Sequence, residues 1–232
     1  MRKALIVSHG QPSAPEVGQR EIEAFAASVS AASDLLDVQG VSLAAPDALE
    51  AMVATLPEGA PLYPLFMADG WFTQVQLPKR LGTAPLHILP PFGGDPGLPE
   101  FVAGWLAKLT ADTGPPAAER TLVVAGHGSG RSPRPAWVTR AFAASVQHML
   151  PFAEVRTGFV EQPPSLEEVL SGLGPDDICL PFFATKRGHV LEDLPEAARA
   201  AGFIGHMLEP IGTHREMPRF IAHSIERALT RS

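Results

Sequence analysis

The segment Ala24-Phe25-Ala26-Ala27-Ser28-Val29 recurs letter for letter as Ala141-Phe142-Ala143-Ala144-Ser145-Val146, 117 positions further along the chain. At the same spacing, Pro64-Leu65-Phe66 returns as Pro181-Phe182-Phe183. A steady spacing that runs through both halves of a chain indicates an internal duplication. Each half can therefore be compared with the other, position by position, to find where they differ.

Each half opens with a short apolar segment that ends in a histidine and a glycine. The first segment covers residues 4–10 and the second covers residues 121–128. Short runs rich in Val, Ile and Leu, followed by glycine, are typical of strands buried on both faces of a parallel sheet. Helical and strand patterns then alternate, which predicts right-handed βαβ units. We therefore expect an α/β fold of two similar lobes, each a parallel sheet with helices on both faces.

The later elements are expected in the same order in both halves. In the first half we expect a helix at 22–32, a strand at 37–44, a short helix at 47–56, a strand at 61–67, a helix at 76–81 and a strand at 86–90. In the second half we expect a helix at 137–150, a strand at 154–161, a short helix at 165–173, a strand at 178–183, a helix at 194–201 and a strand at 205–209. A last helix closes each half. Gly, Pro and Ala at residues 111–119 predict a linker, so the predicted lobes are residues 1–112 and 119–232.

Composition narrows the class of protein. The formal net charge of the 232 residues is −7, without a long basic run, which argues against nucleic acid as the main partner. No stretch approaches the ~20 apolar residues that span a bilayer, and the N-terminus does not read as a signal peptide. The single cysteine, Cys179, cannot form an internal disulfide and is interpreted as a core residue. We expect a cytoplasmic protein without a membrane partner, and the oligomeric state stays open.

Three polar residues of the second half fall at or just past the ends of predicted strands: His127, Glu161 and His189. In open parallel sheets, ligands bind beyond the carboxyl ends of the strands. Because neighbouring strands lie ~4.8 Å apart, side chains at three strand ends can converge on one ion. Two imidazoles and a carboxylate suit a first-row divalent metal, and open coordination positions would make such a site reactive.

The first half serves as an internal control for this site. At the 117-residue spacing, Ala44 corresponds to Glu161, and Phe72 corresponds to His189. Neither alanine nor phenylalanine can coordinate a metal. Only His9 is kept, and we expect it to make a local polar contact rather than to bind a metal.

These motifs resemble the class II tetrapyrrole chelatases, and in particular the sirohydrochlorin cobaltochelatase branch of vitamin B12 biosynthesis. The resemblance covers nearly the whole chain. It rests on His127-Gly128-Ser129-Gly130-Arg131, on Phe159-Val160-Glu161 followed by Pro164-Ser165-Leu166, and on residues 181–195. One departure is Thr185-Lys186-Arg187-Gly188, where the family tends to place Ala-Gly before the second histidine.

The resemblance implies an enzyme that inserts a divalent metal, above all cobalt, into sirohydrochlorin or a related tetrapyrrole in cobalamin biosynthesis. It implies that His127, Glu161 and His189 hold the metal and serve the insertion reaction. The cation is then a substrate, and no organic cofactor is expected, because neither Gly-x-Gly-x-x-Gly nor a P-loop follows either first strand. A substrate that carries several carboxylates could pair with the cations that flank the site, which are Arg131, Arg134, Lys186 and Arg187.

Other functions stay open on the sequence alone. Iron or nickel insertion would use the same ligands, because ligand type does not choose among these metals. A metal or tetrapyrrole carrier without turnover is a second alternative. A histidine phosphatase also places a histidine after its first strand, but it needs an arginine directly before His-Gly, where this chain has Ser8 and Gly126.

Overall fold

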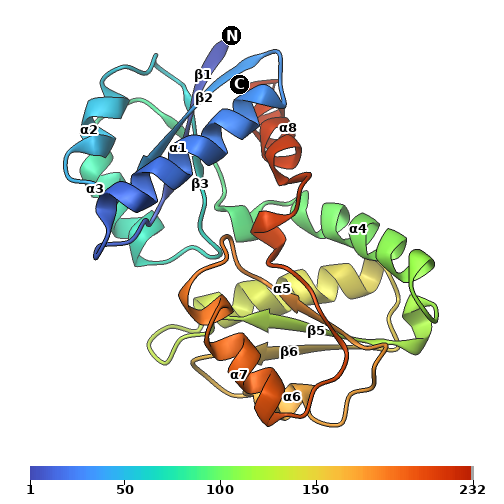
Figure 1. Ribbon diagram of the computed structural model, residues 1–232. Coiled ribbons are helices and arrows are strands. Elements are labelled where there is room, and N and C mark those ends of the chain that lie inside the picture. The colour runs from blue at the N-terminus through green and yellow to red at the C-terminus, as the bar shows by residue number, and fades with distance from the viewer. Residues whose placement is uncertain (231–232) are drawn as a thin grey trace. The chain divides into compact units, whose positions relative to one another are not determined.

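The computed structural model describes residues 1–230, except for the side chain of His189. The first half contains β1 (Arg2–Ser8), α1 (Pro15–Ala31), β2 (Leu36–Ser42), α2 (Ala48–Val53), β3 (Pro61–Pro64), the π-helical turn η1 (Phe72–Gln76), α3 (Leu77–Leu81), β4 (His87–Ile88), η2 (Phe92–Gly94) and α4 (Leu98–Asp112) (Figure 1). The second half contains η3 (Ala117–Glu119), β5 (Thr121–Gly126), α5 (Arg134–Met149), β6 (Glu154–Phe159), α6 (Leu166–Leu170), β7 (Ile178–Pro181), η4 (Gly188–Val190), α7 (Asp193–Ala200), β8 (His206–Met207), η5 (Ile211–Thr213) and α8 (Met217–Thr230).

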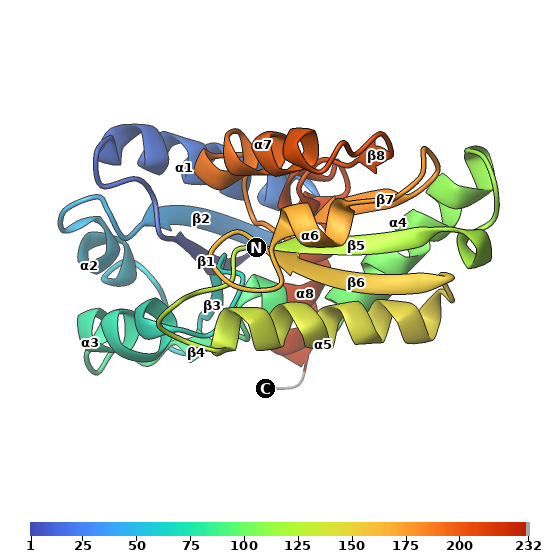
Figure 2. The same cartoon turned by 90° about the horizontal axis from the view of Figure 1, so that it is seen from below.

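The strands form two four-stranded parallel sheets with matching orders, β2-β1-β3-β4 and β6-β5-β7-β8. In the second sheet, α5 covers one face, and α6 and α7 cover the other (Figures 1 and 2). The predicted α/β fold of two similar parallel-sheet halves is confirmed. The order places the first strand of each half between the second and third, so three strand ends are neighbours at one edge.

The central strands are as apolar as the sequence predicted. The four residues Ala4–Val7 of β1 and the four residues Leu122–Ala125 of β5 are all 0% exposed, because helices cover both faces of each sheet. Cys179 is also fully buried, which confirms its interpretation as a core residue. Each fully buried aliphatic side chain contributes about 1.5–3 kcal/mol, so these strands hold each half together.

The duplication extends to backbone contacts outside the sheets. The amide of Gly93 donates to the carbonyl of Phe66 at 3.0 Å, and the amide of Gly212 donates to the carbonyl of Phe183 at the same 3.0 Å. Phe66 and Phe183 are themselves 117 positions apart. The two halves therefore share their loop geometry as well as their strand order.

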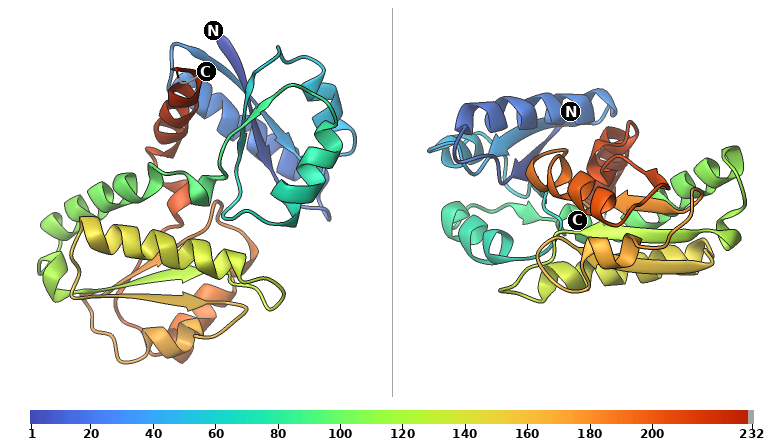
Figure 3. Two further views of the ribbon diagram at one scale, coloured as in Figure 1. Left: turned by 180° about the vertical axis from the view of Figure 1, so that it is seen from behind. Right: turned by 60° about the horizontal axis from the view of Figure 1, so that its bottom comes forward.

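The last helix of each half packs with the other half. One compact unit, unit 1, comprises Met1–Asp95 together with the segment that begins at Arg215, and unit 2 comprises Pro96–His214. Accordingly α4 packs on α5, and α8 packs on α1, as Figure 3 shows. The units therefore differ from the predicted lobes 1–112 and 119–232, and the predicted linker at 111–119 lies within unit 2. A helical apolar stripe tells which face is buried, but not which sheet receives it.

The fourth strand of each sheet is shorter than expected. Residues 86–90 and 205–209 were expected to be strands, whereas β4 and β8 contain two residues each.

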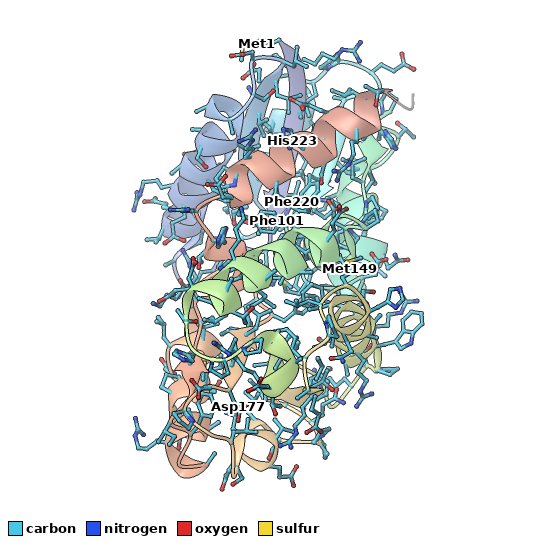
Figure 4. All side chains as sticks on the ribbon, turned by 90° about the vertical axis from the view of Figure 1, so that its right-hand side faces the viewer. Met1, Phe101, Met149, Asp177, Phe220 and His223 are labelled. Atoms are coloured by element: carbon cyan, nitrogen blue, oxygen red, sulfur yellow. The ribbon has the colours of Figure 1, made fainter. Side chains whose placement is uncertain are left out.

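At the amino-terminal edge of the second sheet, the carboxylate of Asp177, which Figure 4 labels, accepts hydrogen bonds from the amide of Thr121 at 2.6 Å and from that of Gly174 at 2.7 Å. No helix among the described residues is long and apolar enough to cross a membrane.

Candidate functional site

His127 and Glu161 lie together at the carboxyl-terminal edge of the second sheet. His127 directly follows β5, and Glu161 lies two residues past β6. The amide of Glu161 donates to the carbonyl of His127 at 2.9 Å, which ties the two strand ends together. Their side chains also meet, with 3.7 Å between His127 Nδ1 and Glu161 Oε2, and they are 40% and 47% exposed. The predicted convergence of these two residues is thus present, in a position that solutes can reach.

A second contact of His127 bears on which of its nitrogens can act as a base. Nδ1 lies 3.0 Å from the carbonyl oxygen of Gly128. A carbonyl oxygen only accepts hydrogen bonds, so this contact is a hydrogen bond in the tautomer that carries its proton on Nδ1. In the neutral ring the lone pair then belongs to Nε2. That nitrogen is suited to bind a metal ion or to accept a proton.

The loop after His127 is held by Gln162, a residue that the sequence analysis did not single out. The Gln162 side-chain oxygen accepts from the amide of Ser129 at 2.9 Å. Gly128 has a φ of +70°, and a β-carbon there would lie 2.6 Å from Gln162 Cγ and 2.9 Å from Phe159 Cβ. Glycine is therefore required at this turn. The repeat could have drawn attention to Gln162, because the residue that corresponds to it at the 117-residue spacing is Ala45.

His189 can be placed only by its backbone, because its side chain lies outside the described part of the structure. It belongs to η4, which follows β7, as the sequence predicted. The next residue, Val190, is buried in the hydrophobic core and anchors this turn. Among the side chains that are described, no three His, Cys, Asp or Glu residues form a metal-binding group. This statement does not extend to the side chain of His189, so the role of His189 as third ligand stays a prediction.

The four predicted substrate-binding cations have different surroundings. Arg131 and Arg134 are exposed, and Arg134 begins α5. Lys186 Nζ lies 2.7 Å from Glu209 Oε1, in an ion pair that is about half exposed. Arg187 is partly buried. Their pairing with substrate carboxylates stays a prediction, and Lys186 would have to exchange Glu209 for the substrate.

Unit 1 repeats the frame of this site without its ligands. His9 Nδ1 lies 2.9 Å from the carbonyl oxygen of Gly10, which confirms the expected local polar contact. The amide of Ala44 donates to the carbonyl of His9 at 3.1 Å, as the amide of Glu161 does to that of His127. The ring of Phe72 lies 4.2 Å from the His9 ring, edge to face. Ala44 and Phe72 are thus the residues of unit 1 that correspond in sequence to Glu161 and His189 of unit 2.

Comparisons with known proteins agree with this architecture. A family model described as CbiX matches residues 121–228. A solved structure described as CbiX, the terminal enzyme for biosynthesis of siroheme in denitrifying bacteria, is 43% identical, with a TM-score of 0.85. That alignment covers 98% of this chain and 99% of the other.

Two more distant relatives extend the comparison. SirB from Bacillus subtilis with Fe3+ is 20% identical, with a TM-score of 0.74 over 98% of this chain and 96% of that one, and so shares the fold. A probable sirohydrochlorin cobaltochelatase of Halobacterium salinarum is 25% identical over 166 residues. This match covers 57% of the chain and only 54% of that relative, about half of its length.

Proposed function

Because the chain belongs to the CbiX family of sirohydrochlorin chelatases, we propose that it inserts a divalent metal ion into sirohydrochlorin. The observation that carries this proposal is the pairing of His127 with Glu161 at two adjacent strand ends, 3.7 Å apart and open to solutes. Unit 1 has the same frame but lacks both the carboxylate and the second histidine, so we assign the reaction to unit 2.

Two metals are candidates. The CbiX relative that is 43% identical to this chain acts in siroheme biosynthesis, which favours ferrous iron. The motifs, together with the cobaltochelatase of Halobacterium salinarum, favour cobalt, the metal expected from the sequence. Imidazole and carboxylate ligands accept both ions. We therefore propose ferrous iron as the first candidate and cobalt as the second.

Insertion requires that the cation lose water molecules and that the macrocycle lose two N–H protons. We assign the first task to His127, whose Nε2 carries the lone pair in the neutral ring, and to His189 on η4. A neutral imidazole can release the cation and then accept a pyrrole proton. Holding both reactants in one site replaces a chance encounter by an oriented one.

Glu161 contributes negative charge beside the histidine. Its carboxylate is 47% exposed, so it can offset part of the charge of an arriving cation without the cost of burying an unpaired ion. It can also pass protons from the imidazole to solvent. Because the metal is a substrate, its binding must be reversible, and a partly exposed site of this kind is suited to that. No organic cofactor is assigned to the reaction.

The rim of the site would receive the carboxylates of the tetrapyrrole. Arg131 and Arg134 are exposed beside the His127 loop, and a guanidinium can bind a carboxylate through two hydrogen bonds. Lys186 and Arg187 directly precede η4, the turn that carries His189, and would bind substrate carboxylates near that turn. The net charge of −7 does not oppose this, because the local potential governs the encounter.

The test is turnover. Purified protein is mixed with sirohydrochlorin and either ferrous or cobaltous ions under anaerobic conditions, and the absorbance change on metal insertion is followed. We expect a rate well above the reaction without protein, and higher for iron than for cobalt. If the protein binds the metal or the tetrapyrrole but does not accelerate insertion, it is a carrier and the proposal is wrong.

A further inference from the structure

One peptide plane of the loop after His127 is contacted at both its carbonyl and its amide by side chains of unit 2. The peptide between Gly128 and Ser129 carries the Gly128 carbonyl, which lies 3.0 Å from His127 Nδ1. The same peptide carries the Ser129 amide, which donates to the Gln162 side-chain oxygen at 2.9 Å. A peptide bond is planar, and in its trans form the C=O and N–H groups point in opposite directions. The side chain that holds the amide therefore also fixes the carbonyl beside the imidazole.

Gln162 is itself held close to this turn. It directly follows Glu161, whose amide donates to the carbonyl of His127 at 2.9 Å. A β-carbon on Gly128 would lie 2.6 Å from Gln162 Cγ, so the aliphatic part of the Gln162 side chain lies directly against the turn. The acceptor oxygen is thus carried by the neighbouring strand end and does not depend on a remote segment.

The same contact extends to the rim of the site. The hydroxyl of Ser129 accepts from the amide of Arg131 at 3.1 Å. Gln162 fixes the amide of Ser129, and Ser129 in turn fixes the backbone of Arg131, one of the cations expected to bind substrate carboxylates. One side chain of the second strand end therefore orders the whole loop from the imidazole to the guanidinium.

Unit 1 has the turn but lacks this acceptor. Gly10 has a φ of +73°, and its carbonyl lies 2.9 Å from His9 Nδ1, so the arrangement of histidine and peptide is repeated. The residue that corresponds to Gln162 at the 117-residue spacing is Ala45, and a methyl group cannot accept a hydrogen bond. The side-chain acceptor therefore occurs in the half that has Glu161 and is replaced in the half that lacks this carboxylate.

We propose that Gln162 is a positioning residue of the insertion reaction, which holds the peptide between Gly128 and Ser129 so that the imidazole of His127 meets the cation in one orientation. This inference rests on the proposed function, because that function assigns the cation to His127. Removal of a group that orients a histidine ligand through its other ring nitrogen costs about 10–100-fold in metal affinity or activity. Gln162 acts through the peptide, so we expect the lower end of this range. The loss should fall on kcat, because metal transfer needs orientation, whereas the ligands themselves remain.

The experiment measures kcat and the KM for the metal during insertion into sirohydrochlorin. Gln162→Leu keeps the aliphatic contact with Gly128 but has no acceptor, so its kcat should fall about tenfold while the KM for the metal stays within about threefold. Gln162→Glu supplies an acceptor oxygen and should restore most of kcat. The matched control is Gln147→Leu, which removes a hydrogen bond of 3.0 Å from a glutamine side chain to the carbonyl of Phe152 near the carboxyl-terminal end of α5. Its kcat should equal that of the wild type.

A second measurement needs no variant. Amide hydrogen exchange in the wild type should be slower at Ser129, whose amide donates to Gln162, than at the exposed residue Gly130. Equally fast exchange at both amides would contradict the hydrogen bond on which the inference depends. Urea unfolding midpoints of the variants establish that each of them is folded under the conditions of the assay.

The outcomes separate this inference from the proposed function. If the wild type does not accelerate insertion, both are wrong. If the wild type is active and Gln162→Leu keeps its full kcat, only the positioning role is wrong. An equal loss of kcat in Gln162→Leu and Gln162→Glu, or in Gln147→Leu, would mean a general packing effect and would also overturn it. So would a loss that appears only in the KM for the metal, because Gln162 would then act on binding rather than on orientation.

Discussion

Glu161 contacts His127 twice: its amide donates to the carbonyl of His127 at 2.9 Å, and its carboxylate lies 3.7 Å from the His127 ring. The backbone contact fixes the distance between the strand ends, so the side-chain contact does not depend on a flexible loop. In unit 1 the backbone contact is present, from Ala44 to His9, and the side-chain contact is absent. The first half is therefore a built-in control for the site in the second half.

His127→Ala should abolish metal insertion, whereas His9→Ala should leave most of it. Removal of a group that binds the cation and accepts a proton costs about 10²–10⁴-fold in rate. His9 has the same contact to its following glycine but no carboxylate beside it, so its loss removes only that local contact. Initial rates with sirohydrochlorin and ferrous or cobaltous ions test both variants. An equal loss in both would mean that the two edges act together.

Glu161→Gln should lower the rate of insertion by about 10–100-fold and weaken cation binding, while the fold stays intact. The substitution keeps the backbone amide that donates to His127 and removes only the charge. The loss should be greatest at low metal concentration, where attraction of the cation limits the rate. A profile of rate against metal concentration measures this. Unchanged kinetics would exclude Glu161 from the reaction.

Gly128→Ala should destabilise the protein by about 1–3 kcal/mol, because the backbone φ of +70° is unfavourable for alanine and the methyl group would collide with Gln162 and Phe159. Gly130→Ala is the matched control, since a β-carbon there meets nothing within 4 Å. Urea unfolding midpoints with unchanged slopes measure the difference. If both variants unfold at the same midpoint, the turn is not held as described.

Cys179 should not react with a thiol reagent in the native protein and should react once urea unfolds it. Burial raises the pKa of its thiol to about 12. In the unfolded chain the pKa of a cysteine thiol is about 8.5. The buried thiol of the folded protein stays protonated at higher pH, so the stability that its burial contributes is complete below about pH 8.5 and is lost as the pH rises toward about 12. The free energy of unfolding of wild type should therefore fall more steeply above about pH 8.5 than that of Cys179→Ala. Parallel slopes would contradict a buried thiol.

The sequence was enough to predict the parallel sheets and the approach of His127 to Glu161. Both follow from local patterns: buried apolar strands, and polar residues at strand ends that a parallel sheet brings to one edge. The repeat added a comparison that singled out Ala44 and Phe72. These features follow from patterns of neighbouring residues within one half, and such patterns can be recognised in a single sequence.

Other features depend on contacts between distant segments, for which the sequence has no periodic signal. The exchange of α4 and α8 between the units is one, since an apolar stripe fits either sheet. The ion pair of Lys186 with Glu209 joins two loops, and no spacing rule predicts it. Gln162 was missed although the repeat distinguishes it from Ala45; the sequence shows that the two halves differ there, but not that the Gln162 side chain accepts a hydrogen bond from the amide of Ser129.

The most direct test is a crystal soaked with cobalt, with anomalous scattering used to locate the ion. We expect one cobalt site in unit 2, within coordination distance of His127 Nε2 and a nitrogen of His189, with Glu161 beside it, and no site next to His9. A cobalt ion bound at His9 would contradict the assignment of the reaction to unit 2. The assignment would also be wrong if no ion binds in unit 2 and the imidazoles of His127 and His189 point away from each other.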